Sequence, residues 1–399
     1  MMTLKEVSLG LHSLSIFRDL LHDEVIKELM AYLDLSDEAD DIVKADLFCR
    51  FVSSLYCHGM GNLSRYVNRI VNESENVYVK AVGEKKDIPD VLKKSLDRDL
   101  KILNAAAHLT SGDLYKGSDI PEWITENCDI MQDYHERINN IAKYGYGIYA
   151  KYHMFYISEQ GSIMPVTNPD ITQLSELIDY KREQKIIIDN TKALIAGKPA
   201  ANILLTGDAG TGKSSTIKAV INELYSEGLR VIEVRKEHLH YIPKLLDELN
   251  SNPLKFIIFI DDLSFTKDDD NFSSLKAILE GSVSAKANNI AIYATSNRRH
   301  LVKESFSDRN GDDVHFNDTM QELLSLSERF GIQLTFNRPD KSTYLDIVHN
   351  LADKQNLKYN TEKLDLEAEK FVLKRGNRSA RAAKQFVDGI IAGNITNII

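Results

Sequence analysis

The stretch NILLTGDAGTGKSSTIKAVINEL, residues 202–224, decides the fold of this chain. An apolar run ends at Thr206, the glycine-rich segment Gly207–Ser214 follows, and a helical stretch continues over Ser215–Leu224. The glycine-rich segment fits the pattern G-x-x-x-x-G-K-[ST] without a mismatch, in the strand–loop–helix setting that this pattern requires. Such a loop wraps backbone N–H groups around an anion, next to a helix N-terminus that favours negative charge. The stretch therefore predicts a phosphate-binding loop.

Within this loop a cation and a hydroxyl have separate roles. Lys213 can reach the β- and γ-phosphates of a nucleoside triphosphate, and the Ser214 hydroxyl can ligate Mg²⁺. A chance match in an ordinary loop is the alternative, and the flanking strand and helix argue against it. The residues predicted to bind nucleotide are Gly207, Asp208, Ala209, Gly210, Thr211, Gly212, Lys213, Ser214 and Ser215.

Polar side chains follow two later apolar runs. The run Phe256–Ile260 ends in Asp261 and Asp262, and the next run is followed by Asn297. The carboxyl ends of parallel strands meet at one edge of a sheet, so we expect these side chains beside the phosphates. Asp261 would hold Mg²⁺, Asp262 would orient or activate the attacking water, and Asn297 would bond the γ-phosphate and that water. Many ATPases carry Glu where Asp262 stands, and the shorter Asp favours slow hydrolysis. A capping or turn role for the two aspartates is the alternative.

The chain is predicted to combine a helical N-terminal part with an α/β part. Residues 11–58 contain neither Gly nor Pro and place apolar residues at helical spacing. After residue 172, apolar runs alternate with helical stretches, which indicates βαβ units in a parallel sheet between helices. The five predicted strands are Asn202–Thr206, Arg230–Val234, Phe256–Ile260, Ile290–Ala294 and Ile332–Phe336. The predicted domains are 1–160 (mainly helical, for partner or substrate recognition), 161–172 (a linker rich in Pro, Asn and Gly), 173–338 (nucleotide-binding α/β) and 339–399 (helical).

Composition narrows the class of protein. A chain of 399 residues with 43% hydrophobic and 27% charged residues is typical of a globular protein of two or three domains. The 49 Lys and Arg against 59 Asp and Glu give a net charge of −10, which argues against a broad nucleic-acid footprint but permits a narrow one inside a ring. The three cysteines form no CxxC pair, so no disulfide framework or zinc site is expected. With no signal peptide or transmembrane run, we expect a cytoplasmic protein without membrane contact.

In this order the motifs resemble those of the AAA+ ATPases, with Gly207–Ser214 as Walker A, Phe256–Asp262 as Walker B and Asn297 as sensor 1. Closer still, several blocks resemble a bacterial family of predicted ATP-binding proteins described only as a domain of unknown function. These blocks are IDDLSF (260–265), SLKAILEGS (274–282), YATSNRRHL (293–301) and LSERFG (326–331). The resemblance covers roughly residues 165–390. It implies a P-loop AAA+ core with a C-terminal helical lid, ATP and Mg²⁺ as ligands, and assembly into a homo-oligomeric ring or spiral. A more distant likeness is to bacterial replication initiators and helicase loaders.

The resemblance also implies roles for arginines. Arg329 would act in trans on the γ-phosphate of a neighbouring subunit, and a salt bridge at a helix end is the alternative. In the lid, Arg378 is the preferred sensor 2 residue and Arg381, three positions later, is a second nucleotide-binding candidate. The segment Asp179–Tyr180 and Arg182 would border the adenine pocket. Arg298 and Arg299 would face phosphate, another subunit or solvent.

Taken together, the sequence predicts an AAA+ ATPase that hydrolyses Mg-ATP to ADP and phosphate at subunit interfaces. Its work would be to remodel or load an unidentified protein or nucleic-acid partner. The alternative is an ATP-dependent assembly switch or scaffold with little turnover. A small-molecule P-loop kinase is disfavoured, because the Arg329 block and the helical tail would have no role in one. Residues 238–241 are interpreted as a helix start rather than as a contact to DNA or protein.

Overall fold

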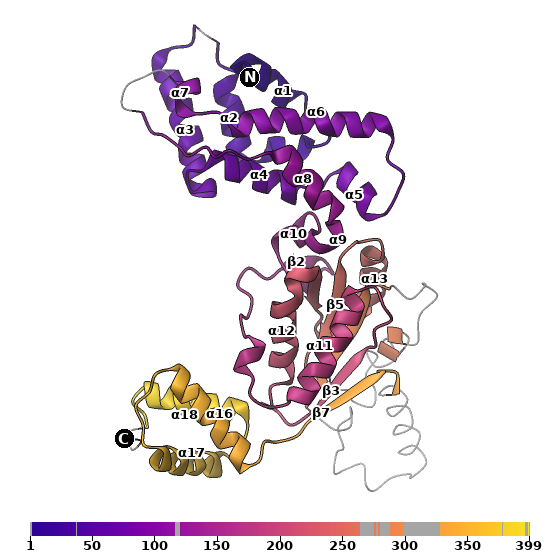
Figure 1. Ribbon diagram of the computed structural model, residues 1–399, viewed down its shortest axis with the longest axis vertical. Coiled ribbons are helices and arrows are strands. Elements are labelled where there is room, and N and C mark those ends of the chain that lie inside the picture. Colours follow the sequence, from indigo (N-terminus) through magenta and orange to yellow (C-terminus); the bar gives the residue numbers. More distant parts are fainter. Residues whose placement is uncertain are drawn as a thin grey trace. The chain divides into compact units, whose positions relative to one another are not determined.

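The computed structural model describes residues 2–36, 38–115, 120–263, 275–276, 278–279, 288–297, 328–376, 378–395 and 398. The chain divides into two compact units, Met1–Lys151 and Tyr152–Ile399 (Figure 1). No helix within the described ranges has the length and apolar character needed to cross a bilayer.

The described residues of the first unit form a helical domain. Polar side chains start several of its helices: Asp23, Asp40 and Asn62 each accept backbone N–H groups of the first turn that lack a partner within the helix. The apolar faces of these helices meet in one core that includes Phe17, Phe51 and Leu100. The elements are α1 (Leu4–His12), η1 (Arg18–His22), α2 (Glu24–Leu33), α3 (Asp41–Gly59), α4 (Leu63–Glu73), α5 (Val77–Gly83), α6 (Asp90–Ala107), α7 (Ser111–Leu114), α8 (Ile130–Asn139), α9 (Ile141–Tyr144) and α10 (Ile148–Lys151).

A seven-stranded sheet organises the second unit, and its strand order is β2-β1-β4-β5-β6-β3-β7. Every neighbouring pair is parallel except β1 and β2, which pair antiparallel. The strands are β1 (Met154–Ile157), β2 (Ile163–Pro165), β3 (Ile203–Gly207), β4 (Leu229–Glu233), β5 (Lys255–Ile260), β6 (Ile290–Ser296) and β7 (Ile332–Phe336). Each of the five predicted strands is present, and the α/β class is confirmed. The order places β6 between β3 and β5, so the phosphate loop and the acid pair leave the sheet on either side of β6.

The first two strands differ from the prediction, which gives five strands, a domain end at residue 160 and a linker over 161–172. In the structure β1 pairs with β4, and β2 extends the sheet by an antiparallel hairpin. The hairpin turn is held by η4 (Lys236–Tyr241), where the Tyr241 hydroxyl donates to the carbonyl of Glu159 at 3.0 Å and a His238 ring nitrogen lies 3.2 Å from the carbonyl of Ile157. The α/β unit therefore begins at Tyr152, and residues 238–241 support its sheet.

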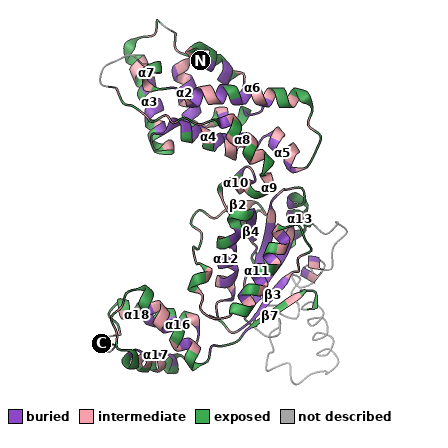
Figure 2. Ribbon diagram, in the orientation of Figure 1, coloured by how far each residue is buried: buried purple, intermediate pink, exposed green. Residues whose placement is uncertain are grey.

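Helices cover the sheet and a separate helical subdomain follows it. Apolar residues of α11 (Lys181–Ile195) and α12 (Lys213–Leu224) share one core with the sheet, whose strands are largely buried in Figure 2. After β7 come α16 (Lys341–Lys354), α17 (Thr361–Arg375) and α18 (Ala380–Ile391), which enclose their own core. The chain after β7 is thus helical, as the sequence predicts, and α16–α18 are called the lid below. The remaining elements are η2 (Leu174–Glu176), η3 (Tyr225–Glu227) and α13 (Ile242–Asn250).

Candidate nucleotide-binding site

The loop between β3 and α12 has the backbone that its glycines predict. Gly207, Gly210 and Gly212 have φ values of +136°, +81° and +95°, a region that residues with a side chain rarely enter. A Cβ added at Gly207 would lie 2.1 Å from the carbonyl oxygen of Phe336 on β7. Close packing against β7 therefore also requires glycine at position 207, and α12 begins directly after the loop at Lys213.

Lys213 is a buried cation, with 5% of its surface exposed. Its Nζ donates to the carbonyls of Gly207 (2.9 Å) and Asp208 (2.8 Å) and to Oδ1 of Asn297 (2.9 Å). Burial lowers the pKa of Lys213, and the nearby Asp261 carboxylate opposes this shift. The hydrogen-bond acceptors of the ammonium are neutral oxygens. An anionic phosphate oxygen would be a stronger acceptor than any of them.

The two predicted magnesium ligands lie together. Ser214 Oγ donates to Oδ1 of Asp261 at 2.6 Å. The described residues contain no cluster of three or more His, Cys, Asp or Glu side chains able to hold a metal. A hydroxyl and one carboxylate are nevertheless hard oxygen donors, and Mg²⁺ in nucleotide sites takes few protein ligands, with phosphates and water completing its shell. The residues present fit Mg²⁺ bound together with a nucleotide.

Asp262, the residue predicted to activate water, is linked to the phosphate loop through Asn297. Asp262 has a left-handed backbone with φ of +53°, and its carboxylate accepts a hydrogen bond from Asn297 Nδ2 at 2.6 Å. The same Asn297 side chain accepts from Lys213 through its oxygen. Asn297 thus bridges the loop cation and the second acid, as its position at the end of the intervening strand β6 allows.

A cavity of ≈ 720 Å³ contains these groups. Its polar side is lined by the phosphate loop from Ala209 to Thr216 and by Asp261, Asp262 and Asn297. Its lining also includes apolar side chains such as Leu177, Ile178, Ile347 and Leu351. The cavity therefore offers anion-binding groups together with apolar surface, the combination that a nucleotide requires.

The segment before α11 borders this cavity in part as predicted. Asp179 and Tyr180 line it, whereas Arg182 does not. The Tyr180 ring packs against Phe336 with 4.5 Å between ring centroids, and its hydroxyl donates to the carbonyl of Asn337. Tyr180 is thereby fixed to the chain segment that connects β7 to the lid.

The two lid arginines differ in their surroundings. Arg381 lines the cavity, and its backbone N–H donates to the carbonyl of Gly210 at 3.3 Å. Arg378 instead forms a two-pronged ion pair with Glu369, at 3.2 Å and 2.9 Å, and does not line the cavity. Of the two sensor 2 candidates, Arg381 therefore lies beside the phosphate loop, whereas Glu369 holds the guanidinium of the preferred Arg378 within the lid.

Arg329 lies away from the cavity of its own chain. It is exposed and comes three residues before β7. In the parallel pairing of β3 with β7, Ile203 aligns with Ile332 and Gly207 with Phe336. Arg329 is thus at the amino edge of the sheet and the phosphate loop at its carboxyl edge. Arg298 and Arg299, and parts of the blocks 260–265, 274–282, 293–301 and 326–331, lie outside the described residues.

Further residues of the site were not predicted. Arg338, between β7 and the lid, donates to the Asp208 carboxylate in the phosphate loop at 3.1 Å. Lys354 and Lys384 of the lid line the cavity. Thr295, two residues before Asn297, contacts both acids. Only the position of Thr295 at the end of a predicted strand could have indicated its role.

The chain is similar to several solved structures, with low sequence identity and low TM-scores. The chain is similar to the Thermotoga maritima RuvB Holliday junction branch migration motor, at 16% identity and a TM-score of 0.38, covering 57% of this chain and 68% of that one. It is also similar to a chain of the E. coli MS115-1 HORMA:CdnC:Trip13 complex, at 12% identity and a TM-score of 0.36, covering 55% and 92%. At these scores neither likeness bears on function.

Sequence comparison gives the family. No curated protein matches the chain. Residues 150–394, well over half of the chain, match a family described as "Protein of unknown function (DUF815)". The matched region spans the whole sheet, the phosphate loop and the helices of the lid. The resemblance of the motif blocks to a family of unknown function is confirmed: the chain belongs to the DUF815 family.

Proposed function

We propose that this protein binds ATP with Mg²⁺ in the cavity between the phosphate loop and the lid, and hydrolyses it to ADP and phosphate. One observation carries the proposal: a single hydrogen-bond network joins Lys213, Asn297 and Asp262 beside the Ser214–Asp261 pair. A buried cation, a magnesium-binding pair and a carboxylate for water are the parts that phosphoryl transfer needs.

Each residue of the site then has its own role in binding or hydrolysing ATP. Lys213 exchanges neutral acceptors for phosphate oxygens, and the loop N–H groups and the α12 N-terminus bind the remaining negative charge. Ser214 and Asp261 hold Mg²⁺, which when bound neutralises charge on the phosphates. Asp262 accepts a hydrogen bond from the attacking water and orients it, and Asn297 positions the same water and the γ-phosphate. Arg381 contributes a further cation from the lid.

Arg329 supports the further proposal that active sites are completed between subunits of a homo-oligomeric ring or spiral. It is exposed at the edge of the sheet opposite the phosphate loop, so its own cavity is out of reach. An arginine supplied in trans raises hydrolysis by about 10³–10⁵ in other NTPases. We expect Arg329 to act on the nucleotide of a second copy of this chain.

The test is ATP turnover per subunit, with Mg²⁺, as a function of protein concentration. We expect the rate per subunit to rise with concentration, because assembly completes the sites. Arg329→Ala should lower the maximal rate about 1,000-fold and leave ATP affinity largely unchanged. Arg235→Ala removes another exposed arginine, at the start of η4, and serves as the control. Normal hydrolysis by Arg329→Ala would assign that residue a structural role.

A second candidate is an ATP-dependent assembly switch with little turnover. The 2.6 Å bond from Asn297 to Asp262 favours it, because this bond engages one of the two carboxylate oxygens that would otherwise accept from water. A negligible rate at every concentration, with ATP still bound, would support the switch.

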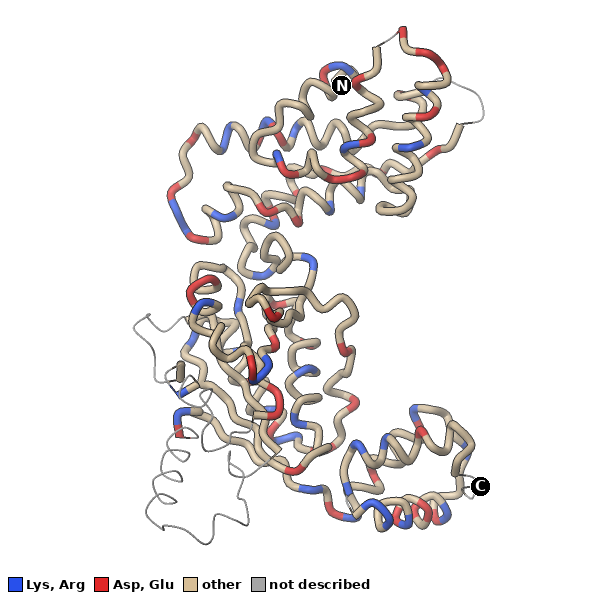
Figure 3. The backbone as a smooth tube through the Cα atoms, turned by 180° about the vertical axis from the view of Figure 1, so that it is seen from behind, with Lys and Arg blue, Asp and Glu red and all other residues tan. Residues whose placement is uncertain are grey.

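The partner of either activity is a protein or a nucleic acid that the first unit would recognise. Lys and Arg are interspersed with Asp and Glu along both units in Figure 3. This distribution and the net charge of −10 favour a partner recognised at a small contact rather than a nucleic acid bound along a broad basic surface.

A further inference from the structure

Thr295 occupies a buried position at the carboxyl end of β6, with 2% of its surface exposed. Its hydroxyl donates to Oδ1 of Asp261 at 2.5 Å and accepts the backbone N–H of Asp262 at 3.0 Å. Its carbonyl accepts the N–H of Leu263 at 2.7 Å. One residue of β6 therefore fixes three consecutive residues at the end of β5.

The direction of the Thr295 hydroxyl bond follows from these contacts. A hydroxyl carries one hydrogen, and the Asp262 N–H can only donate. The Thr295 oxygen accepts that N–H, and its own hydrogen is committed to Asp261. The Thr295 hydroxyl thus donates to the negatively charged Asp261 carboxylate and accepts the N–H of Asp262, whose backbone is left-handed.

All three hydrogen bonds to the Asp261 carboxylate end on the same oxygen. Oδ1 accepts from Ser214 Oγ (2.6 Å), Thr295 Oγ1 (2.5 Å) and Asp262 N (3.1 Å). Within the described part of the chain, no group donates to Oδ2. The carboxylate is therefore held by one oxygen and leaves the other available to a cation or to water bound to it.

We propose that Thr295 is a positioning residue for the magnesium ion and for Asp262. Its hydroxyl fixes the Asp261 carboxylate through Oδ1, which would leave Oδ2 to bind the ion, and its acceptance of the Asp262 N–H fixes the backbone of the second acid, which lines the cavity. The inference rests on the proposed Mg-ATP binding. Residues that orient a metal ligand typically change metal affinity or activity by 10- to 100-fold when they are removed.

The test compares Thr295→Val, which keeps the shape and removes the hydroxyl, with Thr295→Ser, which keeps the hydroxyl. The readout is the affinity for a fluorescent ATP analogue, titrated with Mg²⁺ and again in EDTA. For Thr295→Val, the Mg²⁺ concentration that gives half of the metal-dependent gain in affinity for the ATP analogue should be about 10- to 100-fold higher than for the wild type. Its affinity in EDTA should equal that of the wild type. Thr295→Ser should restore the wild-type Mg²⁺ dependence.

Thr191→Val is the matched control, because Thr191 is a fully buried threonine of α11 whose hydroxyl contacts Ile187 and Tyr293 and no acid. If Thr295→Val does not fold, Thr295→Ala removes the hydroxyl with less bulk and is measured in the same way. An unchanged Mg²⁺ dependence in the folded hydroxyl-free variant, or equal behaviour of the Val and Ser variants, would overturn the role of Thr295. A wild type whose ATP affinity does not respond to Mg²⁺ would instead overturn the proposed function.

Discussion

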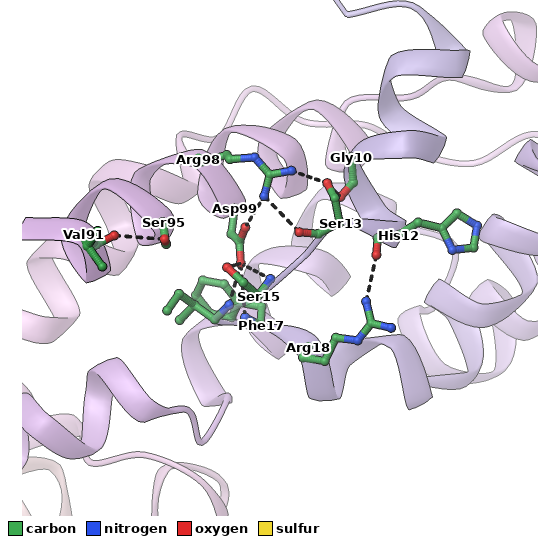
Figure 4. A network of polar contacts seen from close by, with 11 residues as sticks. Gly10, His12, Ser13, Ser15, Phe17, Arg18, Val91, Ser95, Arg98 and Asp99 are labelled. Carbon is green, nitrogen blue, oxygen red and sulfur yellow. Dashed lines mark hydrogen bonds and ion pairs between the residues drawn. The ribbon is translucent and has the colours of Figure 1, made fainter.

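Two aspartates, Asp99 in the first unit and Asp261 in the second, show how differently this chain uses a carboxylate. Asp99 on α6 of the first unit has no exposed surface. Its Oδ2 accepts the N–H groups of Ser15 and Ile16, both at 2.7 Å, and Oδ1 accepts from Arg98 at 3.3 Å (Figure 4). Asp261 of the second unit is only half-buried, and its hydrogen-bond donors within the described residues all meet one oxygen.

The difference separates a structural carboxylate from one available to a ligand. Both oxygens of Asp99 are occupied, and Arg98 also donates to the Ser13 carbonyl at 2.9 Å, so α6 is tied to residues 13–17. A fully satisfied buried charge fixes a fold, whereas a partly satisfied one retains affinity for a cation. Changes in the first network should therefore affect stability, and changes in the second should affect nucleotide binding.

The largest effect is expected for Lys213→Ala. ATP affinity should fall by at least about 100-fold, because the phosphates lose their principal cation in a desolvated site. The free energy of unfolding should change little, since the ammonium is buried among neutral acceptors. Titration with a fluorescent ATP analogue and urea unfolding measure the two effects. Lys218→Ala, on the same helix and not lining the cavity, is the control. Unchanged ATP affinity in Lys213→Ala would remove the proposed nucleotide site.

The second prediction concerns Asp99→Asn. Its amide group would face N–H donors, which should lower the free energy of unfolding of the first unit by about 2 kcal/mol. The single tryptophan, Trp123, lies in this unit and packs against Phe51, so its fluorescence reports the unfolding in urea. ATP affinity should be unchanged. Asp97→Asn, on the same helix but half-exposed, is the control. A loss of ATP affinity without a loss of stability would contradict the division between the units.

The smallest effect should separate the two lid arginines. Arg381→Ala should weaken ATP binding about tenfold, the size of one charge-assisted hydrogen bond. Arg378→Ala should leave the affinity nearly unchanged and cost less than about 1 kcal/mol of stability, because its ion pair with Glu369 is partly exposed. The ATP titration gives the change in affinity and thermal unfolding gives the change in stability, each measured on matched samples. A larger loss of affinity in Arg378→Ala would restore the choice made from the sequence.

The parts of the fold and site that could be predicted are those fixed by short segments. The phosphate loop carries its glycines, lysine and serine within eight residues, and the apolar run before Asp261 identifies a buried strand without further information. Asn297 follows from the same logic, since it ends the neighbouring strand. These residues meet because the carboxyl ends of parallel strands lie at one edge of the sheet. The alternation of strands and helices along the sequence is enough to indicate that the strands are parallel.

The parts that could not be predicted depend on contacts between distant segments. The strand β1 is four residues long and lies in an aromatic stretch, and β2 is three residues long and ends in Pro165, so neither shows a periodic pattern. Nothing in the spacing of Arg378 and Arg381 indicates that Glu369 binds the first of them. The bond from Arg338 to Asp208 likewise joins residues 130 positions apart.

The left-handed backbone of Asp262 has a consequence for how this family can evolve. Aspartate, asparagine and glycine enter that conformation more readily than longer side chains do, so glutamate is disfavoured here by the backbone. Asparagine would retain the turn and lose the negative charge. Under the proposed function, one atom of one side chain would therefore separate a site that hydrolyses ATP from one that only binds it, with the folded nucleotide site preserved.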